Sequence, residues 1–483
     1  MAADISVHID PSFAESASVW RRAFTAAGVE VIAGRRRADL TFVNGPALRR
    51  RRFKQAPRTA ATWMALGYEG GATAEPEDGA WDGLDAVICS DEDTRLAAEK
   101  SSPTLIGRIF VIPRPGDDAM LRRIVERLLP RPAAPAGRSR VRLGLVGYNL
   151  KFFAPIMCHL EAIPWMETRV DEWPRFAVND PAATREIVEW SDLVVCEWCG
   201  PNTVYASRHK QPGQRLVTRL HRFELYRDAW RDVDIDAVDA VVTVAPHYRD
   251  LVVSTTGWPE SKVVVIPNWV DDLELARPKT PAARFTLGML GAGTARKRLD
   301  RAVEVLELLR RDDDRFKLRV KTEMPWESRW VWADEAERAH FDPLFARLEK
   351  PSLAGAVTFD PFGPDVGAWL RDVGFVLSTS DDESFHLAPA EGMASGAVPV
   401  VWAWPGSEHV YDDRWRCSTV DEMFALIRAC ADPARWSEAG KEAQREVVAR
   451  YGPDGVLRRW VDLFTDLLAG RCRRRQPSLH SAA

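Results

Sequence analysis

The stretch that decides the fold is Ser378–Gly406, STSDDESFHLAPAEGMASGAVPVVWAWPG. An apolar run leads into this stretch and predicts a strand that breaks in the acidic loop Asp381–Glu383. A helix should follow, because Pro389 is tolerated in a first turn and Gly396 suits the position just past a helix end. A second strand is predicted over Val398–Trp402, so the stretch is a strand–loop–helix–strand unit.

Two carboxylates, Glu383 in the loop and Glu391 in the predicted first turn of the helix, give this unit its chemistry. The free N–H groups at a helix N-terminus attract a phosphate. Glu391 could then accept hydrogen bonds from the two hydroxyls of a ribose, and Glu383 from hydroxyls of a sugar beyond the phosphate. The alternative is that the two acids merely offset the helix dipole.

The residues from Glu383 to Val401, E-S-F-H-L-A-P-A-E-G-M-A-S-G-A-V-P-V-V, resemble the signature of retaining glycosyltransferases with the two-domain GT-B fold, family 4-like. The usual form there is E-G-F-G-x3-x-E-A-M-A-x-G-x-P-V-V. This chain departs from it at Ser384 and His386, where glycines are usual. The resemblance implies that the backbone beside these positions lies against a nucleotide-sugar donor. The donor-binding residues implied in this stretch are Ser384, Phe385, His386, Leu387 and Glu391.

A glycine-rich turn after the predicted strand Phe285–Gly291 is a second candidate anion site. Such a turn presents backbone N–H groups, and basic side chains add charge. The alternative is a solvated basic helix start, which the helix dipole disfavours unless an anion is bound. The resembled family carries an Arg and, five residues later, a Lys in this turn; Lys297 matches the Lys, but Ala292 stands at the Arg position. The predicted donor-binding residues of this turn are Gly293, Thr294, Arg296, Lys297 and Arg298, with Arg296 or Arg298 as replacement for the missing arginine.

Composition sets limits on the function. The 483 residues predict two or three domains, and a net charge of −4 gives no indication of nucleic-acid binding. No apolar run approaches the roughly 20 residues of a membrane span. The first residues lack the pattern of a signal peptide, and seven scattered cysteines fit reduced thiols. We therefore expect a cytoplasmic protein.

Alternating strands and helices predict an α/β protein with parallel sheets. The resemblance covers about residues 140–470 and implies GT-B architecture, with two Rossmann-like domains facing a cleft. An extra N-terminal α/β domain precedes them, ending at the Pro/Ala-rich segment Pro130–Gly137. The predicted divisions are an extra domain over 1–132, an acceptor domain over 139–277 joined by the C-terminal helix 454–470, and a nucleotide-sugar domain over 283–440.

A short sequence pattern of the extra domain recurs in the acceptor domain. Asp85-Ala-Val-Ile-Cys is followed, 28 residues on, by Pro113, and Asp239-Ala-Val-Val-Thr is followed at the same distance by Pro267. Chance could produce such short words, but the equal spacing favours a common origin. Our hypothesis is that residues 1–132 are a diverged duplicate that serves acceptor binding or assembly rather than chemistry.

Three residues of the acceptor domain are candidates for contact with the reacting groups. Glu197 and His221 are predicted at strand ends, where open α/β sheets place ligands, and His209 lies in a polar loop. Each could orient a hydroxyl, although a lone histidine is more often structural. In the resembled family the leaving phosphate can itself take the acceptor's proton, so a dedicated base need not exist. Phe362, after a predicted sheet-edge strand, is either a stacking partner for the donor base or a core residue.

The sequence thus predicts a retaining glycosyltransferase that moves a sugar from a UDP- or GDP-sugar to an unidentified acceptor, with no cofactor and, as the resemblance implies, no metal. The predicted catalytic residues are Glu383, Lys297, His221 and Glu197. The alternatives are a GT-B sugar-nucleotide epimerase and a non-catalytic nucleotide-sugar-binding subunit; no motif nominates the lysine that a phosphorylase would need. The basic clusters Arg49–Arg52 and Arg471–Arg475 leave contact with a membrane surface open, and a homo-oligomer is also open.

Overall fold

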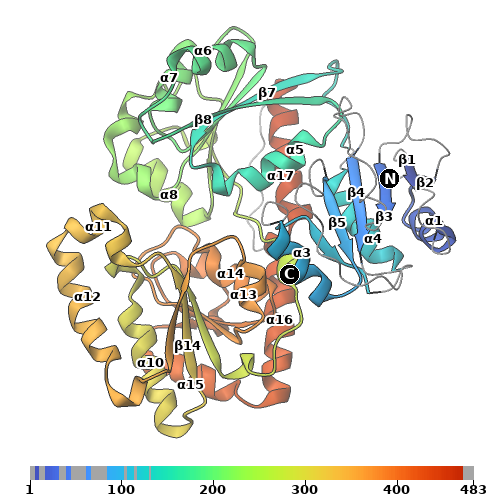
Figure 1. Cartoon of the computed structure of the whole chain (residues 1–483). Helices are drawn as coiled ribbons and strands as arrows, with labels where there is room; N and C mark the ends of the chain where they lie inside the picture. The colour runs from blue at the N-terminus through green and yellow to red at the C-terminus, as the bar shows by residue number, and fades with distance from the viewer. Residues whose placement is uncertain are drawn as a thin grey trace. The chain divides into compact units, whose positions relative to one another are not determined.

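Three six-stranded parallel sheets, each flanked by helices, make up the chain (Figure 1). The structure is a computed structural model, and it describes residues 6–9, 17–31, 40–44, 61–66, 84–102, 106–113, 117–129 and 132–471. The α/β fold class predicted from the sequence is confirmed.

The first sheet has the strand order β2-β1-β3-β4-β5-β6. Its strands are β1 (Ser6–Ile9), β2 (Glu30–Val31), β3 (Leu40–Asn44), β4 (Ala61–Leu66), β5 (Ala86–Cys89) and β6 (Ile109–Val111). The helices are α1 (Ala17–Ala26), α3 (Glu92–Ser101) and α4 (Asp118–Leu128). Apolar side chains of α1 and α4 bury one face of the sheet, with Trp20, Phe24 and Phe42 packed ring against ring.

The second sheet has the order β12-β11-β10-β9-β7-β8. Its strands are β7 (Val141–Tyr148), β8 (Met166–Trp173), β9 (Leu193–Glu197), β10 (Arg215–Arg219), β11 (Ala240–Thr243) and β12 (Val263–Val265). The helices are α5 (Ala154–Glu161), α6 (Pro181–Trp190), α7 (Pro201–His209) and α8 (Pro246–Thr256). The C-terminal helix α17 (Pro453–Leu468) also packs into this core, where Trp460 meets Phe153 with ring centroids 5.2 Å apart.

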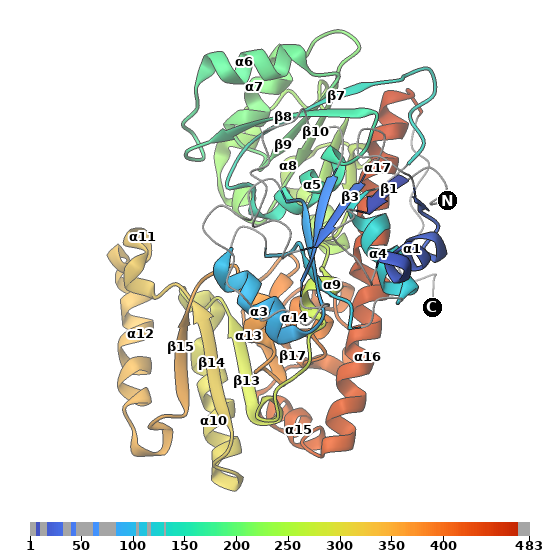
Figure 2. The same ribbon diagram turned by 45° about the vertical axis from the view of Figure 1, so that its right-hand side comes forward.

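The third sheet has the order β15-β14-β13-β16-β17-β18, and Figure 2 shows β13, β14 and β15 side by side. Its strands are β13 (Thr286–Leu290), β14 (Lys317–Thr322), β15 (Val357–Pro361), β16 (Phe375–Ser378), β17 (Val398–Trp402) and β18 (Arg416–Cys417). The helices are α10 (Leu299–Asp312), α11 (Arg329–Ala333), α12 (Glu335–Leu348), α14 (Leu387–Ala394), α15 (Val420–Ala429) and α16 (Pro433–Tyr451). Gly452 separates α16 from α17, whose first residue is Pro453.

Three strands escaped the sequence analysis. β8 lies at a sheet edge and pairs only with β7, and five of its eight residues are polar, so it lacks the apolar run that marks the central strands. β18 has two residues. β4 follows the basic segment Arg49–Arg52, which lies outside the described residues.

The first two sheets have the same strand order. If the strands of each sheet are numbered in sequence order, both sheets have the order 2-1-3-4-5-6. Their registers also agree: Val87 pairs with Ile109 in the first sheet and Val241 with Val263 in the second, so both partners are offset by 154 residues. These observations support the proposed duplication. The third sheet differs, since its order is third, second, first, fourth, fifth and sixth strand.

The chain forms two compact units, and each unit consists of segments that are not consecutive in the sequence. The first unit contains Met1–Arg131 together with Asp271–Ala283 and Phe362–Asp372. The added segments carry α9 (Asp272–Leu275) and α13 (Val366–Leu370). Asp271–Ala283 is the covalent linker between the second and third sheets, so the linker folds with the N-terminal domain.

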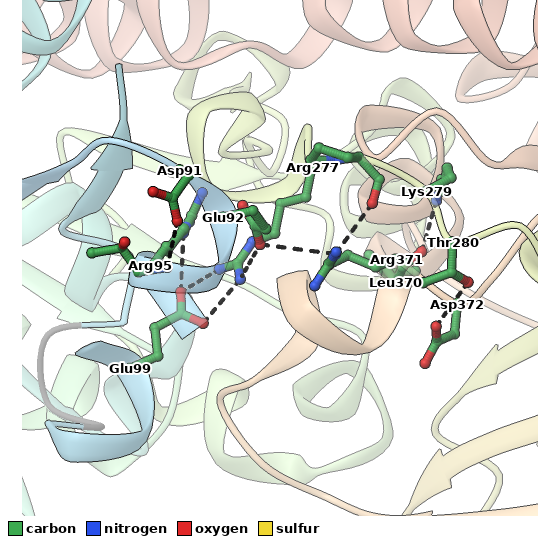
Figure 3. A network of polar contacts seen from close by, with 12 residues as sticks. Asp91, Glu92, Arg95, Glu99, Arg277, Lys279, Thr280, Leu370, Arg371 and Asp372 are labelled. Atoms are coloured by element: carbon green, nitrogen blue, oxygen red, sulfur yellow. Dashed lines mark hydrogen bonds and ion pairs between the residues drawn. The ribbon is translucent and has the colours of Figure 1, made fainter. Parts of the chain in front are cut away.

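A buried network of ion pairs ties this linker to α3 (Figure 3). Arg277, which is 5% exposed, donates to Glu99 with Nη2–Oε1 and Nη1–Oε2 distances of 2.5 and 2.9 Å. It also pairs with Glu274 and Glu92, and Arg95 of α3 pairs with Glu274 and Glu99. Burial makes each of these charges depend on its partners.

We therefore predict that Arg277→Ala will strongly destabilise the first unit. Removing one partner of a buried ion network costs about 3–5 kcal/mol, and here Arg95 alone would remain to balance the buried Glu99 and Glu274. Arg140→Ala is the matched control, since Arg140 pairs with Glu167 at an exposed site and should cost about 0–1 kcal/mol. Urea denaturation followed by tryptophan fluorescence measures both. Equal losses in the two variants would show that the network is not structural.

Candidate functional site

The strand order of the third sheet brings together the two predicted motifs, the glycine-rich turn after β13 and the loop after β16. β13 pairs with β16 in parallel, so the carboxyl ends of both strands lie at one edge of the sheet. The turn Gly291–Arg298 follows β13, and the loop Thr379–His386 follows β16. Among the hydrogen bonds that join them, Thr379 Oγ1 donates to the Lys297 carbonyl at 2.7 Å and the Asp381 N–H donates to the Arg296 carbonyl at 3.0 Å.

Glu383 is the centre of this site. Its Oε1 lies 2.6 Å from Lys297 Nζ and 2.9 Å from Arg296 Nη1, and its side chain is buried. Burial alone would raise the pKa of Glu383, but the positive groups around it, Lys297 and Arg296 among them, hold that pKa well below its ordinary value. Burial lowers the pKa of Lys297, which Glu383 partly opposes. Glu383 is therefore a carboxylate, and the two cations around it make its position one that attracts anions.

Arg298 does not join this group. Its guanidinium pairs with Asp300 at 2.7 Å and with Asp381 at 3.1 Å. Hydrogen bonding to Asp300 raises the pKa of Arg298, so its charge is already matched. Of the two arginines proposed to replace the missing one, the geometry thus favours Arg296.

The glycine-rich turn is closely fitted. Gly293 leaves no room for a side chain, because a Cβ there would lie 2.9 Å from the Glu323 carbonyl oxygen. Thr294 precedes the 3-10 turn Ala295–Lys297 and accepts the Lys297 N–H at its carbonyl, 3.0 Å away. This turn fixes the direction of Lys297.

The predicted donor-binding residues that follow Glu383 differ in their surroundings. Phe385 is buried and packs on Tyr451 with ring centroids 4.9 Å apart, so its side chain belongs to the core. Ser384 and Leu387 are half-buried or buried at the margin of the loop. His386 is buried and has φ of 55°, a left-handed conformation in which glycine is the usual residue.

Glu391 lies in the second turn of α14, as its fifth residue, and not in the first turn as the sequence analysis placed it. The helix starts earlier than Pro389 suggested, because His386 takes the N-cap position. The residue is half-buried. Within the described part of the chain, the Glu391 carboxyl has no hydrogen-bond or ion-pair partner, and burial raises its pKa to about 7.

The second predicted group lies at the carboxyl edge of the second sheet. Glu197 is fully buried and its Oε1 lies 2.9 Å from His221 Nε2 and 3.1 Å from Arg219 Nη1. Burial would raise the pKa of Glu197, but Arg219 and His221 lower it. Arg219 also donates to Asn268, and Glu224 accepts the His221 N–H at 3.1 Å. The sequence analysis missed Arg219, Glu224 and Asn268 as members of this group.

Aromatic rings cover His221. The Trp198 ring centroid lies 4.2 Å from that of His221, and the Phe152 centroid lies 5.4 Å from it. Trp198 has φ of 68°, which is rare for a bulky residue and concentrates at functional sites. The strand-end position of Glu197-Trp198 was the available signal, since ligands of open α/β sheets bind there.

Two further candidates, His209 and Phe362, have different surroundings. His209 is exposed and stacks on Tyr205, with its Nδ1 2.8 Å from the Tyr205 carbonyl. Phe362 is 59% exposed and belongs to the first compact unit, so it is not a core residue.

Other sequence predictions concern metals and membranes. Within the described residues, no group of three or more His, Cys, Asp or Glu side chains is arranged to hold a metal ion. None of the described helices has the length and apolar character to cross a bilayer. Of the two basic clusters, Arg471 pairs with Asp466 at 2.9 Å, while Cys472–Arg475 and Arg49–Arg52 lie outside the described residues.

Comparison with known proteins gives matches at the level of structure. No family model and no curated protein matches the chain. Sucrose-phosphate synthase from Thermosynechococcus elongatus is 15% identical, with a TM-score of 0.52 over 68% of this chain and 100% of that one. HepE from Anabaena, solved in complex with UDP and glucose, is 13% identical, with a TM-score of 0.51 over 68% and 100%. The chain spans 59% of the length of TarM, at 16% identity and a TM-score of 0.46. The chain thus has the GT-B fold of glycosyltransferases.

The unpaired Glu391 carboxyl predicts a specific pH dependence of stability. Between its ordinary pKa of 4.5 and about 7, the folded protein keeps a proton that the unfolded chain releases. The free energy of unfolding should therefore fall as pH rises through this window, by on the order of 3 kcal/mol, at 1.36 kcal/mol per pKa unit. Glu391→Gln should remove this part of the fall. Urea titrations at pH 5 and pH 7.5 measure it, and identical pH profiles for both proteins would contradict the partnerless carboxyl.

Proposed function

We propose that the protein is a retaining glycosyltransferase that uses a nucleotide-sugar donor. The observation that carries the proposal is the meeting of Arg296, Lys297 and Glu383 at the carboxyl edge of the third sheet, at the loop that leads into the helix of the partnerless Glu391. Two cations at the start of a helix suit a diphosphate. A carboxyl without a protein partner suits the hydroxyls of a ribose.

The chemistry follows from charge. When the bond between sugar and diphosphate breaks, negative charge grows on the departing phosphate, and Arg296 and Lys297 stabilise it where it develops. In the ligand-free protein both cations are held by Glu383. An arriving diphosphate competes with this carboxylate, and Glu383 released from the cations is then available to hold hydroxyls of the sugar.

We place the binding of the acceptor at the strand ends of the second sheet. His221 is oriented by its bond to Glu197, and aromatic rings border it at the strand ends. A hydroxyl of the acceptor or of the donor sugar could be held there. The reaction keeps the anomeric configuration if the acceptor attacks from the face that the phosphate leaves, with that phosphate taking the proton.

The proposed donor is a UDP- or GDP-sugar. A thermal-shift screen of UDP- and GDP-sugars would show which base the protein binds. The likeness to HepE, which was solved with UDP and glucose, makes UDP-glucose the first compound to test. A bound ligand raises the unfolding temperature by mass action. If no nucleotide sugar among UDP- and GDP-sugars shifts the transition, the proposed function fails.

Lys297→Met should reduce turnover of the donor by about 10²–10³-fold, the range for losing one preorganised donor at a site of developing charge. Folding should be retained, because Glu383 keeps Arg296 as a partner. The matched control is Lys317→Met, at the first residue of β14, where the lysine is exposed. Donor hydrolysis measured by release of the nucleoside diphosphate compares them. Equal rates in the two variants would place the phosphate site elsewhere.

The stereochemistry and metal requirement form a separate prediction. The product should have the anomeric configuration of the donor, read from the one-bond C–H coupling by NMR, and activity should persist in EDTA because arginine and lysine supply the positive charge. An inverted product would contradict the retaining mechanism. A donor sugar that is epimerised and released without an acceptor would instead identify the epimerase alternative.

A further inference from the structure

His386 is the residue at which this site departs furthest from the pattern it resembles. Glycine is usual there, and the backbone still takes a glycine-like φ of 55° and ψ of 79°. A non-glycine residue in this conformation costs of order 1–3 kcal/mol unless the surroundings fix it, and such residues cluster at functional sites. The surroundings do fix it, because the His386 carbonyl accepts the Tyr411 hydroxyl at 2.6 Å.

The His386 ring is held at both nitrogens. Nδ1 lies 2.6 Å from Ser378 Oγ, and Nε2 lies 3.4 Å from Lys297 Nζ and 3.9 Å from Glu383 Oε1. A lysine ammonium can only donate, so Nε2 must offer its lone pair and Nδ1 must carry the proton. Burial, then the charges of Lys297 and Arg296, lower the pKa of His386 to about 3. The ring is therefore neutral in the ligand-free protein.

The site lacks one cation. Ala292 stands where the resembled family has an arginine, and Arg298 is matched by Asp300 and Asp381. Among the described residues, Arg296 and Lys297 are the arginine and lysine paired with Glu383. Because Nε2 and Lys297 Nζ are 3.4 Å apart, a phosphate oxygen bonded to the lysine lies within reach of the ring.

We propose that His386 serves as a third cationic ligand of the donor diphosphate, taking one proton from solvent onto Nε2 when the nucleotide binds. The proposal rests on the proposed function. A diphosphate adds two negative charges beside the ring, and these favour the imidazolium, whereas Lys297 and Arg296 oppose it. Of the other groups that face the ring, Glu383 also favours the charge, and Ser378 and Tyr411 are neutral. No bond to phosphorus forms, and Nδ1 keeps its proton.

The test is calorimetric titration of UDP-glucose, with GDP-mannose if UDP-glucose does not bind. Both phosphates of these compounds are fully ionised across pH 6–8, so they contribute no proton of their own. Titrations in buffers of different ionisation enthalpy count the protons taken up. Wild type should take up close to one proton more than His386→Gln at pH 7, and its affinity should therefore fall by roughly tenfold for each pH unit around pH 7.

The variants separate charge from structure. His386→Gln keeps a polar side chain without a titratable group, and at pH 6 it should bind the donor about ten- to a hundredfold more weakly. His386→Gly restores the glycine-compatible backbone, so it should fold at least as stably and show the same loss of proton uptake. His159→Gln, on α5 of the second sheet, is the control and should match wild type.

The outcomes distinguish the two proposals. If wild type binds neither compound, the proposed function fails. If wild type binds, but His386→Gln and His386→Gly show the same proton uptake and pH dependence as wild type, His386 carries no charge in the complex and this inference is overturned. Weaker binding without any change in proton uptake would also overturn it, because His386 would then only position Lys297.

Discussion

The burial of Lys297 depends on Glu383, and the rest of the site depends on that pair. An ammonium removed from water is stable only beside an anion, and the Glu383 carboxylate, 2.6 Å away, supplies it. The pair joins the turn after β13 to the loop after β16, two segments far apart in the sequence. The same loop then sets the start of α14, which places His386 beside the lysine and Glu391 one turn further on. In our proposal, an anion that replaces Glu383 beside Lys297 also lies close to His386.

The parallel topology explains why such a site forms here. In a parallel sheet every strand ends at the same edge, so the polar residues that end neighbouring strands meet without any one segment containing them. This holds for the second sheet as well, where Glu197 ends β9 and Arg219 ends the adjacent β10. The first sheet has the strand order of the second, and its β5–β6 pair has the register of β11–β12. Its helix α3 pairs with Arg277 of the interdomain linker, and both roles proposed for the N-terminal domain, acceptor binding and assembly, stay predictions.

Much of this could be predicted from the sequence. Apolar runs ending in polar residues marked the central strands, and the resemblance of the Glu383–Val401 stretch and of the turn with Lys297 to a glycosyltransferase signature marked the candidate site. The remainder depends on tertiary structure. β8 has no apolar run because it is an edge strand, and the true start of α14 follows from the left-handed conformation of His386. Arg219 and Asn268 are 49 residues apart in sequence and meet only across the folded sheet. The inclusion of the linker in the N-terminal unit follows from ion pairs between segments about 180 residues apart, for which a single sequence carries no signal.

A crystal structure of the protein with an intact nucleotide sugar tests the central claim most directly. The account predicts the diphosphate within hydrogen-bond distance of Arg296 and Lys297, the ribose hydroxyls on Glu391, and Glu383 moved from the two cations toward the sugar. A diphosphate bound at another sheet edge, with the Lys297–Glu383 pair intact, would contradict it.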